Sequence, residues 1–237
     1  MCTLTWWREA ADTYEVFFNR DEKKTRSAAH PPRMLRRNDV SFLAPIDPDG
    51  GGTWILANAR GVVVCLLNRW HEEDTARQPS RSRGELVMEM ASLENVPAVE
   101  ERLRGENLVG VRPFTMVGFD AVGERAWSWN GRELKVGKPH LPLCSSSYHF
   151  EEVKMARRER FEVLQASLRP GGELLESFHG DLGSEGAASA FTPRMCRPDA
   201  QTMSRSRVRV SGNRVTWTYL EEQRDLAGAP RRYEAAL

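Results

Sequence analysis

The residue whose position is most suggestive of chemistry is Cys2, the second residue of the chain. Methionine is usually removed from a Met-Cys start because the second side chain is small, and the chain then begins with a residue that carries both a thiol and a free α-amine. The pKa is about 7.7–8.0 for such an amine and about 8.5 for a thiol, so the amine can accept the thiol proton near neutral pH. The resulting thiolate attacks amides, thioesters and esters, which predicts acyl transfer. The structural alternative is an ordinary small residue in a buried strand.

A predicted hairpin brings further polar residues to Cys2. Residues 2–7 and 14–19 are rich in β-forming side chains and are separated by a short polar stretch. Antiparallel pairing puts Cys2 near Asn19, and the sequence Asn-Arg-Asp-Glu at 19–22 continues beside it. We therefore expect a thiol, an amide, a guanidinium and two carboxylates in one small volume.

A second candidate, Asn68, ends a run that is apolar at every position from 62 to 67. Such a strand is buried on both faces. An amide N–H at its end is a preorganised donor in a low dielectric, as an oxyanion hole requires; a strand-end cap is the alternative. Trp54, which lies near the same end of the predicted sheets, is a candidate for ligand contact and equally for the core.

The remaining elements place these residues in a fold that mixes strands and helices. Residues 23–50 are rich in Pro, Arg and Asp and are predicted to form a long surface loop. Apolar periodicity and capping residues predict helices over 83–93, from Pro97 after a cap at Asn95, over 151–168 and over 173–178. The other expected strands are 54–57, 62–68, 114–119, 125–130, 132–136, 141–144, 202–210, 214–220 and 232–236. Consecutive hairpins with helices grouped in the middle indicate an α+β fold, and residues 1–237 are expected to form a single domain.

Composition narrows the class of protein. The 237 residues include 34 Lys and Arg against 33 Asp and Glu, a net charge of +1, which lacks the basic excess of a nucleic-acid binder. No apolar run is long enough for a transmembrane segment, and no basic segment followed by an apolar one forms a secretion signal. The four cysteines form no CxxC pair, and the five histidines form no HExxH motif, so no metal site is expected. We expect a cytoplasmic protein with reduced thiols and a small-molecule partner; the sequence does not determine the oligomeric state.

The arginine clusters at 33–37, 157–160 and 205–209 are expected on solvated faces, because charged side chains are most often solvated. In the last cluster, arginines alternate with apolar residues, as on the outer side of a strand.

Several motifs spread along nearly the whole chain together resemble one family. They are Cys2-Thr3-Leu4, Phe18-Asn19-Arg20-Asp21-Glu22, Ala44-Pro45-Ile46-Asp47-Pro48-Asp49-Gly50-Gly51-Gly52-Thr53-Trp54, Cys65-Leu66-Leu67-Asn68-Arg69 and Met195-Cys196-Arg197-Pro198-Asp199-Ala200-Gln201-Thr202-Met203-Ser204. This combination resembles the NRDE family, which includes the eukaryotic transport and Golgi organisation 2 proteins. The resemblance implies an N-terminal-nucleophile hydrolase fold, a four-layer αββα sandwich, distantly similar to choloylglycine hydrolases and penicillin V acylases.

In those hydrolases the mature N-terminal cysteine is the nucleophile, an arginine and an aspartate after the second strand orient it, and an asparagine at the end of a later strand helps to form the oxyanion hole. Cys2, Asp21 and Asn68 match those positions by motif. Arg20 is a further catalytic candidate, and the resemblance adds Asn19 to the expected substrate contacts.

The chain departs from the hydrolase pattern at two places. The hydrolases have Arg-Asn-x-Asp, so the arginine of this chain, Arg20, is displaced by two positions and does not simply inherit the hydrolase role. They also have a second asparagine before the long helix, where this chain has Cys-Ser-Ser-Ser at 144–147. Ser145 and Ser146, or a backbone N–H, are therefore the expected substitutes there.

Two functions of different classes follow from the resemblance. One is a cysteine-dependent hydrolase of a small-molecule amide or thioester, with no cofactor. The other is a non-catalytic carrier of haem or of an acyl conjugate, since the family has been linked to haem trafficking and to lipid and acyl-CoA metabolism. Haem would then be a transported ligand, with His71, His149 or Cys2 as a candidate axial ligand.

Overall fold

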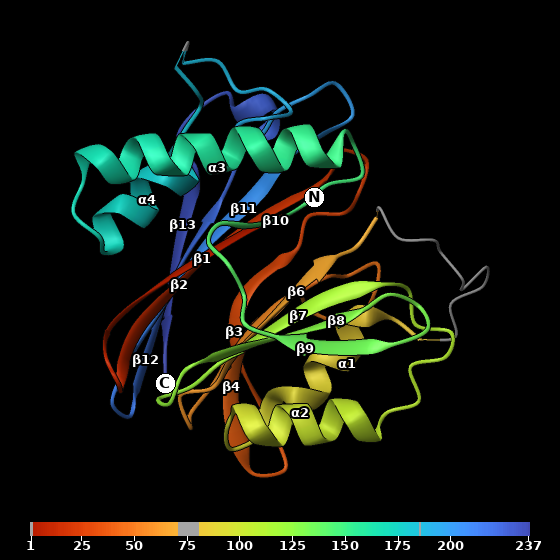
Figure 1. Cartoon of the computed structure of the whole chain (residues 1–237). Coiled ribbons are helices and arrows are strands. Elements are labelled where there is room, and N and C mark those ends of the chain that lie inside the picture. The colour runs from red at the N-terminus through yellow and green to blue at the C-terminus, as the bar shows by residue number, and fades with distance from the viewer. Residues whose placement is uncertain (1, 71–80, 185) are drawn as a thin grey trace.

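Two antiparallel sheets and four helices form the chain in a computed structural model that describes residues 2–70, 81–184 and 186–237 (Figure 1). The first sheet has the order β10-β1-β2-β11-β12-β13 and the second the order β3-β4-β5-β6-β7-β8-β9. The strands are β1 (Cys2–Ala10), β2 (Thr13–Lys23), β3 (His30–Arg37), β4 (Val40–Ile46), β5 (Ile55–Asn58), β6 (Val63–Asn68), β7 (Phe114–Phe119), β8 (Glu124–Trp129), β9 (Leu134–Gly137), β10 (Leu143–Ser145), β11 (Ala200–Ser211), β12 (Arg214–Glu221) and β13 (Arg231–Ala236). The helices are α1 (Arg83–Glu89), α2 (Val96–Gly105), α3 (Phe150–Ser167) and α4 (Gly172–Gly180), with short 3₁₀ turns η1 (Met90–Ser92) and η2 (Arg224–Leu226).

The sheets stack face to face, with α1 and α2 on the outer side of one and α3 and α4 on the outer side of the other (Figure 1). Three apolar clusters fill the three interfaces between these four layers: one between the sheets, one beneath α1 and α2, and a smaller one beneath α3 and α4. The predicted α+β fold with an αββα sandwich is therefore confirmed.

Strand β2 lies inside its sheet, between β1 and β11, and both of its faces are buried. Successive side chains of a strand point to opposite faces. Val16 and Phe18 therefore pack between the sheets, whereas Phe17 packs against the helices. This alternation decides where each residue of the 19–22 motif points.

The expected long loop over 23–50 is wrong, because β3 and β4 occupy most of it. Strand β3 is an exposed strand at the edge of its sheet. Its two prolines argue against a strand in the sequence, but an edge position tolerates them. A bulge interrupts the pairing of β3 with β4 between His30 and Arg33. Strand β4 is mostly buried.

The expected hairpin is confirmed, with longer strands and a register one residue away from the expectation: Cys2 pairs with Arg20 rather than with Asn19. The predicted helix over 83–93 is α1 continued by η1, and the cap at Asn95 begins α2 as expected.

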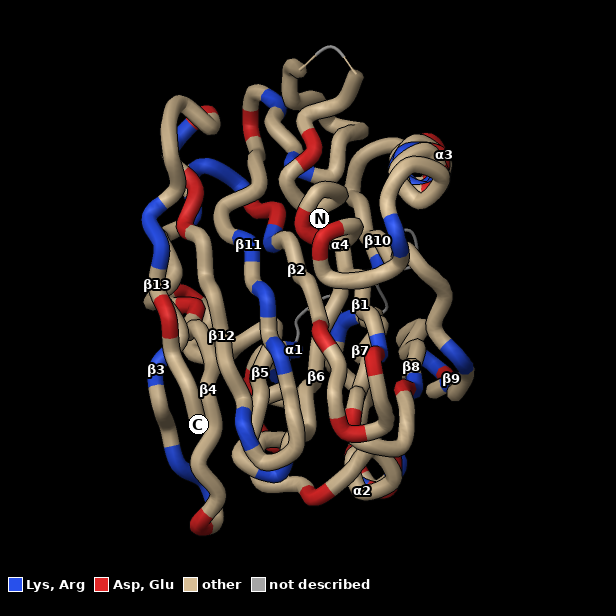
Figure 2. Tube along the Cα trace, turned by 90° about the vertical axis from the view of Figure 1, so that its left-hand side faces the viewer, with Lys and Arg blue, Asp and Glu red and all other residues tan. Residues whose placement is uncertain are grey.

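The arginines at 205–209 alternate with buried residues along β11, as predicted, and Figure 2 marks these basic positions along the strand. They lie on the outer side of the sheet, because Arg207 pairs with Phe17, which packs against the helices. The cluster is not simply solvated, because Arg207 and Arg209 both pair with the buried carboxylate of Glu15 on β2, at 3.0 Å and 2.7 Å. The expectation for the cluster at 157–160 is wrong at Arg157, which is completely buried.

Candidate active site

Cys2 is the first residue of β1, between β10 and β2, and its side chain belongs to the apolar cluster between the sheets. Only 8% of the residue is exposed. Burial raises the pKa of its thiol to about 11, and the negative charge of Asp21 adds to this, while the positive charges of the chain terminus and of Arg20 oppose it. In the chain that carries Met1 the thiol is therefore held protonated.

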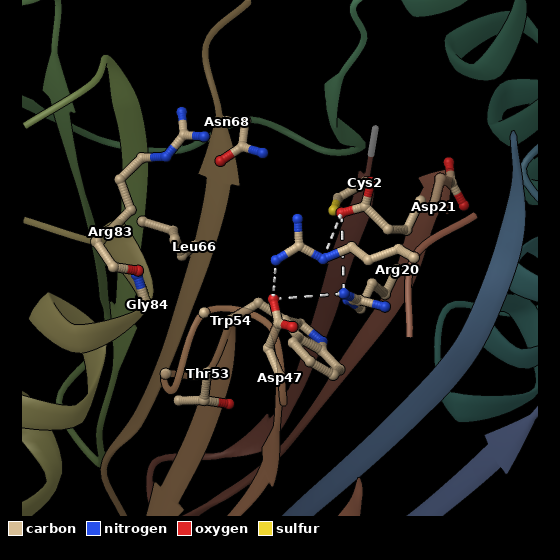
Figure 3. Close-up of a pocket in the computed structure, with 15 residues that line it drawn as sticks. Cys2, Arg20, Asp21, Asp47, Thr53, Trp54, Leu66, Asn68, Arg83 and Gly84 are labelled. Carbon is tan, nitrogen blue, oxygen red and sulfur yellow. Dashed lines mark hydrogen bonds and ion pairs between the residues drawn. The ribbon is translucent and has the colours of Figure 1, made fainter. Parts of the chain in front are cut away.

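A cavity of about 140 Å³ opens beside Cys2 (Figure 3). Cys2 and Arg20 lie on one side of it, and Asn68 and Arg83 on the other (Figure 3). The residues that line it are Cys2, Arg20, Asp21, Glu22, Arg26, Asp47, Gly50, Gly52, Thr53, Trp54, Leu66, Asn68, Ser82, Arg83 and Gly84. Three of the four predicted catalytic side chains, Cys2, Arg20 and Asn68, therefore border one space.

Two arginines and two carboxylates beside Cys2 form a network of ion pairs. The Arg20 guanidinium lies over the ring of Trp54, 4.4 Å from its centroid, and 3.7 Å from the carboxylate of Asp47. Arg26 reaches the same carboxylate at 2.5 Å and lies 3.8 Å from Glu22. Sequence reasoning missed Arg26 and Asp47, although Asp47 belongs to one of the quoted motifs.

Trp54 belongs to the apolar cluster between the sheets, as one of its two predicted roles requires, and it also lines the cavity under Arg20. Its contact with a ligand stays a prediction. Its indole N–H is buried without a hydrogen-bond partner among the described residues. Buried donors of this kind are nearly always paired in native proteins, directly or through water.

Asn68 offers a backbone donor as well as its side chain. In β6 the N–H of Leu66 binds the carbonyl of Trp54 at 2.8 Å, and the N–H of Arg69 binds Pro113 on the opposite side at 3.2 Å. Because N–H groups alternate between the two sides of a strand, the N–H of Asn68 points to the side of Trp54, beyond the start of β5 and towards the cavity. The described residues provide it with no hydrogen-bond acceptor.

The loop between β4 and β5 forms one wall of the cavity because a glycine lets it approach α1. A Cβ on Gly52 would lie 2.3 Å from the carbonyl carbon of Gly84. The N–H of Thr53 donates to the carbonyl of Gly84 at 3.2 Å, which fastens the loop to the start of α1. The glycine-rich motif is thus needed for a close approach of two backbones.

The side chains of Asp21 and Asn19 do not join Cys2, which corrects the expectation that the whole 19–22 motif converges on the thiol. Strand alternation turns both to the helical face, and Figure 3 shows the Asp21 carboxylate directed away from the cavity. Asp21 takes part at the cavity through its backbone, which is hydrogen-bonded to Cys2.

On the helical face, Asp21 pairs with the buried Arg157 of α3 at 3.2 Å and accepts a hydrogen bond from Thr202 at 2.7 Å. Arg157 also donates to Thr3 of β1. The signal for Arg157 was present in the sequence: it lies four residues from both Val153 and Phe161, on the inward stripe of the helix.

Asn19 binds His179 of α4 rather than a substrate. Its amide nitrogen donates to the carbonyls of His179 and Pro193, so its oxygen accepts from Nδ1 of His179 at 2.7 Å. Nε2 of His179 then accepts from the hydroxyl of Thr5 at 2.8 Å. Burial lowers the pKa of His179 well below 6.5, so the ring is neutral and serves the packing of α4 on the sheet.

The two serines before the long helix differ in whether their hydroxyl groups already have a hydrogen-bond partner. Ser145 pairs with Cys2 across β10 and β1, so both side chains lie on the face between the sheets. Its hydroxyl is buried and has no hydrogen-bond partner among the described residues. The hydroxyl of Ser146, by contrast, is engaged with the backbone of Tyr148 in the turn before α3.

His149, one of the two histidines proposed as haem ligands, does not line the Cys2 cavity. His149 is exposed at the start of α3, 3.2 Å from Glu152, and His71 is outside the described residues. Within the described ranges, no group of three or more His, Cys, Asp or Glu side chains is arranged to hold a metal ion. Among the same residues, no helix has the length and apolar character needed to cross a membrane.

Comparison with solved structures shows the same fold in known hydrolases. Two variant structures of a conjugated bile acid hydrolase from Clostridium perfringens match 99% of this chain and 97% of their own, at 12% identity, with TM-scores of 0.54 and 0.55. The N-acylethanolamine-hydrolyzing acid amidase orthologue of Caenorhabditis elegans matches 87% of this chain and 92% of its own, at 8% identity, with a TM-score of 0.59. No curated protein sequence matches.

The sequence itself identifies the family. The profile of the family described as Transport and Golgi organisation 2 matches residues 1–177, about three quarters of the chain, and this range contains Cys2, the 19–22 motif and Asn68. With the N-terminal-nucleophile hydrolase fold established by the structural neighbours, the chain belongs to the transport and Golgi organisation 2 family.

Proposed function

We propose that this protein is a cysteine-dependent hydrolase of a small-molecule amide or thioester, with Cys2 as the nucleophile. One observation carries the proposal: Cys2, which follows Met1, lines a cavity together with Asn68, whose backbone N–H has no acceptor among the described residues. The fold shared with a bile acid hydrolase and an acid amidase supports the reaction class.

In the proposed reaction, removal of Met1 frees the α-amine of Cys2, which takes the thiol proton. The thiolate adds to the substrate carbonyl, and the oxyanion accepts hydrogen bonds from Asn68. The ammonium then returns its proton to the leaving amine or thiol as the bond to the carbonyl carbon breaks, which leaves a thioester on Cys2. Water, deprotonated by the same amine, adds to this thioester and releases the acid and the thiol. Arg20 favours the thiolate through its charge.

The proposal requires the removal of Met1. A thiol with a pKa of about 11 is ionised only to about one part in ten thousand at pH 7. A free ammonium on Cys2 itself lies closer to the sulfur than one on a preceding residue, and a nearby positive charge lowers a thiol pKa. The Met1-free chain should therefore react much faster at neutral pH.

Covalent labelling tests the proposal. An acyl thioester probe should acylate Cys2 of the Met1-free chain at pH 7 at least tenfold faster than Cys65, Cys144 or Cys196, as read by mass spectrometry of peptides. An N-terminal extension should abolish this preference, and Asn68→Pro, which removes the backbone N–H, should slow acylation more than Asn68→Ala. Equal labelling of Cys2 with and without the extension would contradict the role of the α-amine.

A carrier without turnover is the second candidate, and the raised pKa of the buried Cys2 thiol favours it, because a protonated thiol is a poor nucleophile. If haem is the cargo, titration with haem should produce a saturable Soret shift that a single histidine or Cys2 substitution abolishes. A spectrum equal to that of free haem at micromolar protein would contradict this candidate.

A further inference from the structure

A second and larger cavity of about 570 Å³ lies next to the Cys2 cavity, and Asn68 borders both. One wall is formed by the inward faces of β6, β7 and β8, through Leu67, Thr115 and Ala126, and the opposite wall is β10. The connection from β9 to β10 passes from one sheet to the other here (Figure 1). The cavity is thus an extension of the space between the sheets, at the end where Cys2 lies.

Among the described residues, the lysines that line this second cavity outnumber its carboxylates. Lys135, Lys138 and Lys154 line it together with Arg69, and the described lining holds the single carboxylate of Glu151. The whole chain has only five lysines, and three of them line this one cavity. Lys138 has no ion-pair partner within the described part of the chain.

The other two lysines have weak, exposed partners: Lys135 lies 3.5 Å from Glu133, and Lys154 lies 3.4 Å from Glu151. Exposed pairs of this kind contribute little to stability, so an anionic ligand can compete for these lysines. The carboxylates around Cys2, by contrast, already occupy Arg20 and Arg26. The lysines of the second cavity are therefore more available to an anionic group than Arg20 and Arg26 are.

The β10 wall of the second cavity, near Cys2, contains a polar atom without a hydrogen-bond partner among the described residues. Ser145 is only 3% exposed, lines the second cavity, and its hydroxyl has no hydrogen-bond partner among the described residues. Buried polar atoms in native proteins are nearly always paired, directly or through water. A ligand in this cavity can satisfy this hydroxyl close to Cys2, while apolar residues such as Leu67 and Leu143 cover its body.

We propose that the second cavity binds an amphipathic molecule whose apolar body lies between the sheets and whose anionic end lies among Lys135, Lys138 and Lys154. The claim that the second cavity binds such a molecule depends on the cavity alone. The further claim that this molecule is the substrate, with its reacting carbonyl near Asn68 and Ser145, rests on the proposed function.

Binding can be tested separately from catalysis in the full chain with Cys2→Ala. The fluorescent probe 8-anilinonaphthalene-1-sulfonate, which is apolar with one sulfonate, should bind saturably, and decanoate should displace it at lower concentration than the neutral decanamide. The triple variant Lys135→Gln/Lys138→Gln/Lys154→Gln should weaken decanoate binding by roughly fivefold or more and leave decanamide unchanged. Lys23→Gln, an exposed lysine of β2 away from the cavity, is the matched control.

A second variant locates the site. Ser128→Phe puts a ring into the cavity next to Thr115 and should abolish probe binding, with thermal unfolding measured to show that the variant is folded. The proposal is overturned if decanoate and decanamide compete equally well, or if the triple variant binds decanoate as the parent does. Binding that meets these expectations together with no acylation of Cys2 in the native sequence would reject the hydrolase and leave the binding site in place.

Discussion

At the scale of single residues, the motif at 19–22 serves two sites because it lies on a strand buried on both faces. Arg20 and Glu22 face the Cys2 cavity, whereas Asn19 and Asp21 hold the helices on the sheet. The sequence correctly predicts that Cys2 and the motif are neighbours in a hairpin. It also contains the alternation that separates the motif into two halves, so this part of the site was predictable from the period of a strand.

The ion pair between Asp21 and Arg157 yields a stability prediction. Both side chains are completely buried, so Arg157→Met leaves the carboxylate of Asp21 without its cation in a dry environment. We expect a loss of about 3–5 kcal/mol in the free energy of unfolding, measured by urea denaturation. The adjacent Arg158→Met removes only an exposed pair with Glu162 and should change stability by less than about 0.5 kcal/mol. Similar values for the two variants would contradict a structural role for Arg157.

At the scale of elements, strong periodicity predicted the helices and most strands to within a few residues. It failed for β3, because prolines and arginines on an exposed edge strand give no apolar alternation. It also missed β4, although the mostly apolar and buried residues of that strand carried a signal. The cavity was beyond prediction for a different reason. Arg26 and Asp47 are 21 residues apart and meet only because β3 and β4 fold back between them and the loop before β5 docks on α1.

That docking depends on Gly52. We expect Gly52→Ala to cost about 1–3 kcal/mol, because the new methyl group overlaps the backbone of Gly84, and to displace the wall of the Cys2 cavity. Gly105→Ala is the control, because a Cβ at Gly105 meets no atom within 4 Å. Thermal unfolding measures the cost, and the acylation rate of Cys2 reports on the cavity. A variant with native stability and native reactivity would show that the close approach is not required.

His179, which attaches α4 to the sheet, leads to a prediction about how the stability of the fold depends on pH. The pKa of His179 is lowered in the folded chain, far below the ordinary value of 6.5, so below pH 6.5 the unfolded chain binds a proton that the folded chain does not. Stability is therefore full above pH 6.5 and falls with acidification by up to about 1.4 kcal/mol per pH unit.

His179→Gln should remove this slope, although it lowers stability at neutral pH by breaking the contacts to Asn19 and Thr5. His140→Gln, at an exposed position, should retain it. Urea denaturation between pH 5 and pH 7 distinguishes the two. An acid slope that persists in His179→Gln would assign the effect to other groups.

At the scale of the whole molecule, the first sheet carries the residues of the candidate site on one face and the residues that hold the helices on the other. Its inner face carries Cys2, Arg20 and Ser145 towards the space between the sheets, and its outer face carries Thr3, Asn19 and Asp21 towards the helices. Substitutions of neighbouring residues in β2 should therefore affect different properties. A sequence comparison alone, which treats residues 19–22 as one motif, does not lead to this expectation.

Arg20→Met and Asp21→Asn provide the direct test. The charge of Arg20 lowers the pKa of Cys2 and that of Asp21 raises it, so alkylation of Cys2 by iodoacetamide at pH 8 should slow in Arg20→Met and quicken in Asp21→Asn. We expect changes of roughly threefold to tenfold, since one pKa unit is tenfold in thiolate. Stability should fall mainly in Asp21→Asn, because Arg157 then keeps a buried charge without its counterion.

Local opening of the chain is the competing explanation for faster alkylation, and Cys65 controls for it. Cys65 is completely buried in the same apolar cluster, so opening exposes both thiols, whereas a change in charge acts on Cys2. The ratio of Cys2 to Cys65 labelling, read by mass spectrometry well below the unfolding temperature, should therefore rise in Asp21→Asn and fall in Arg20→Met. Parallel changes in both thiols would mean that the two faces of the sheet are not independent, and that Asp21 acts on Cys2 only by holding the fold together.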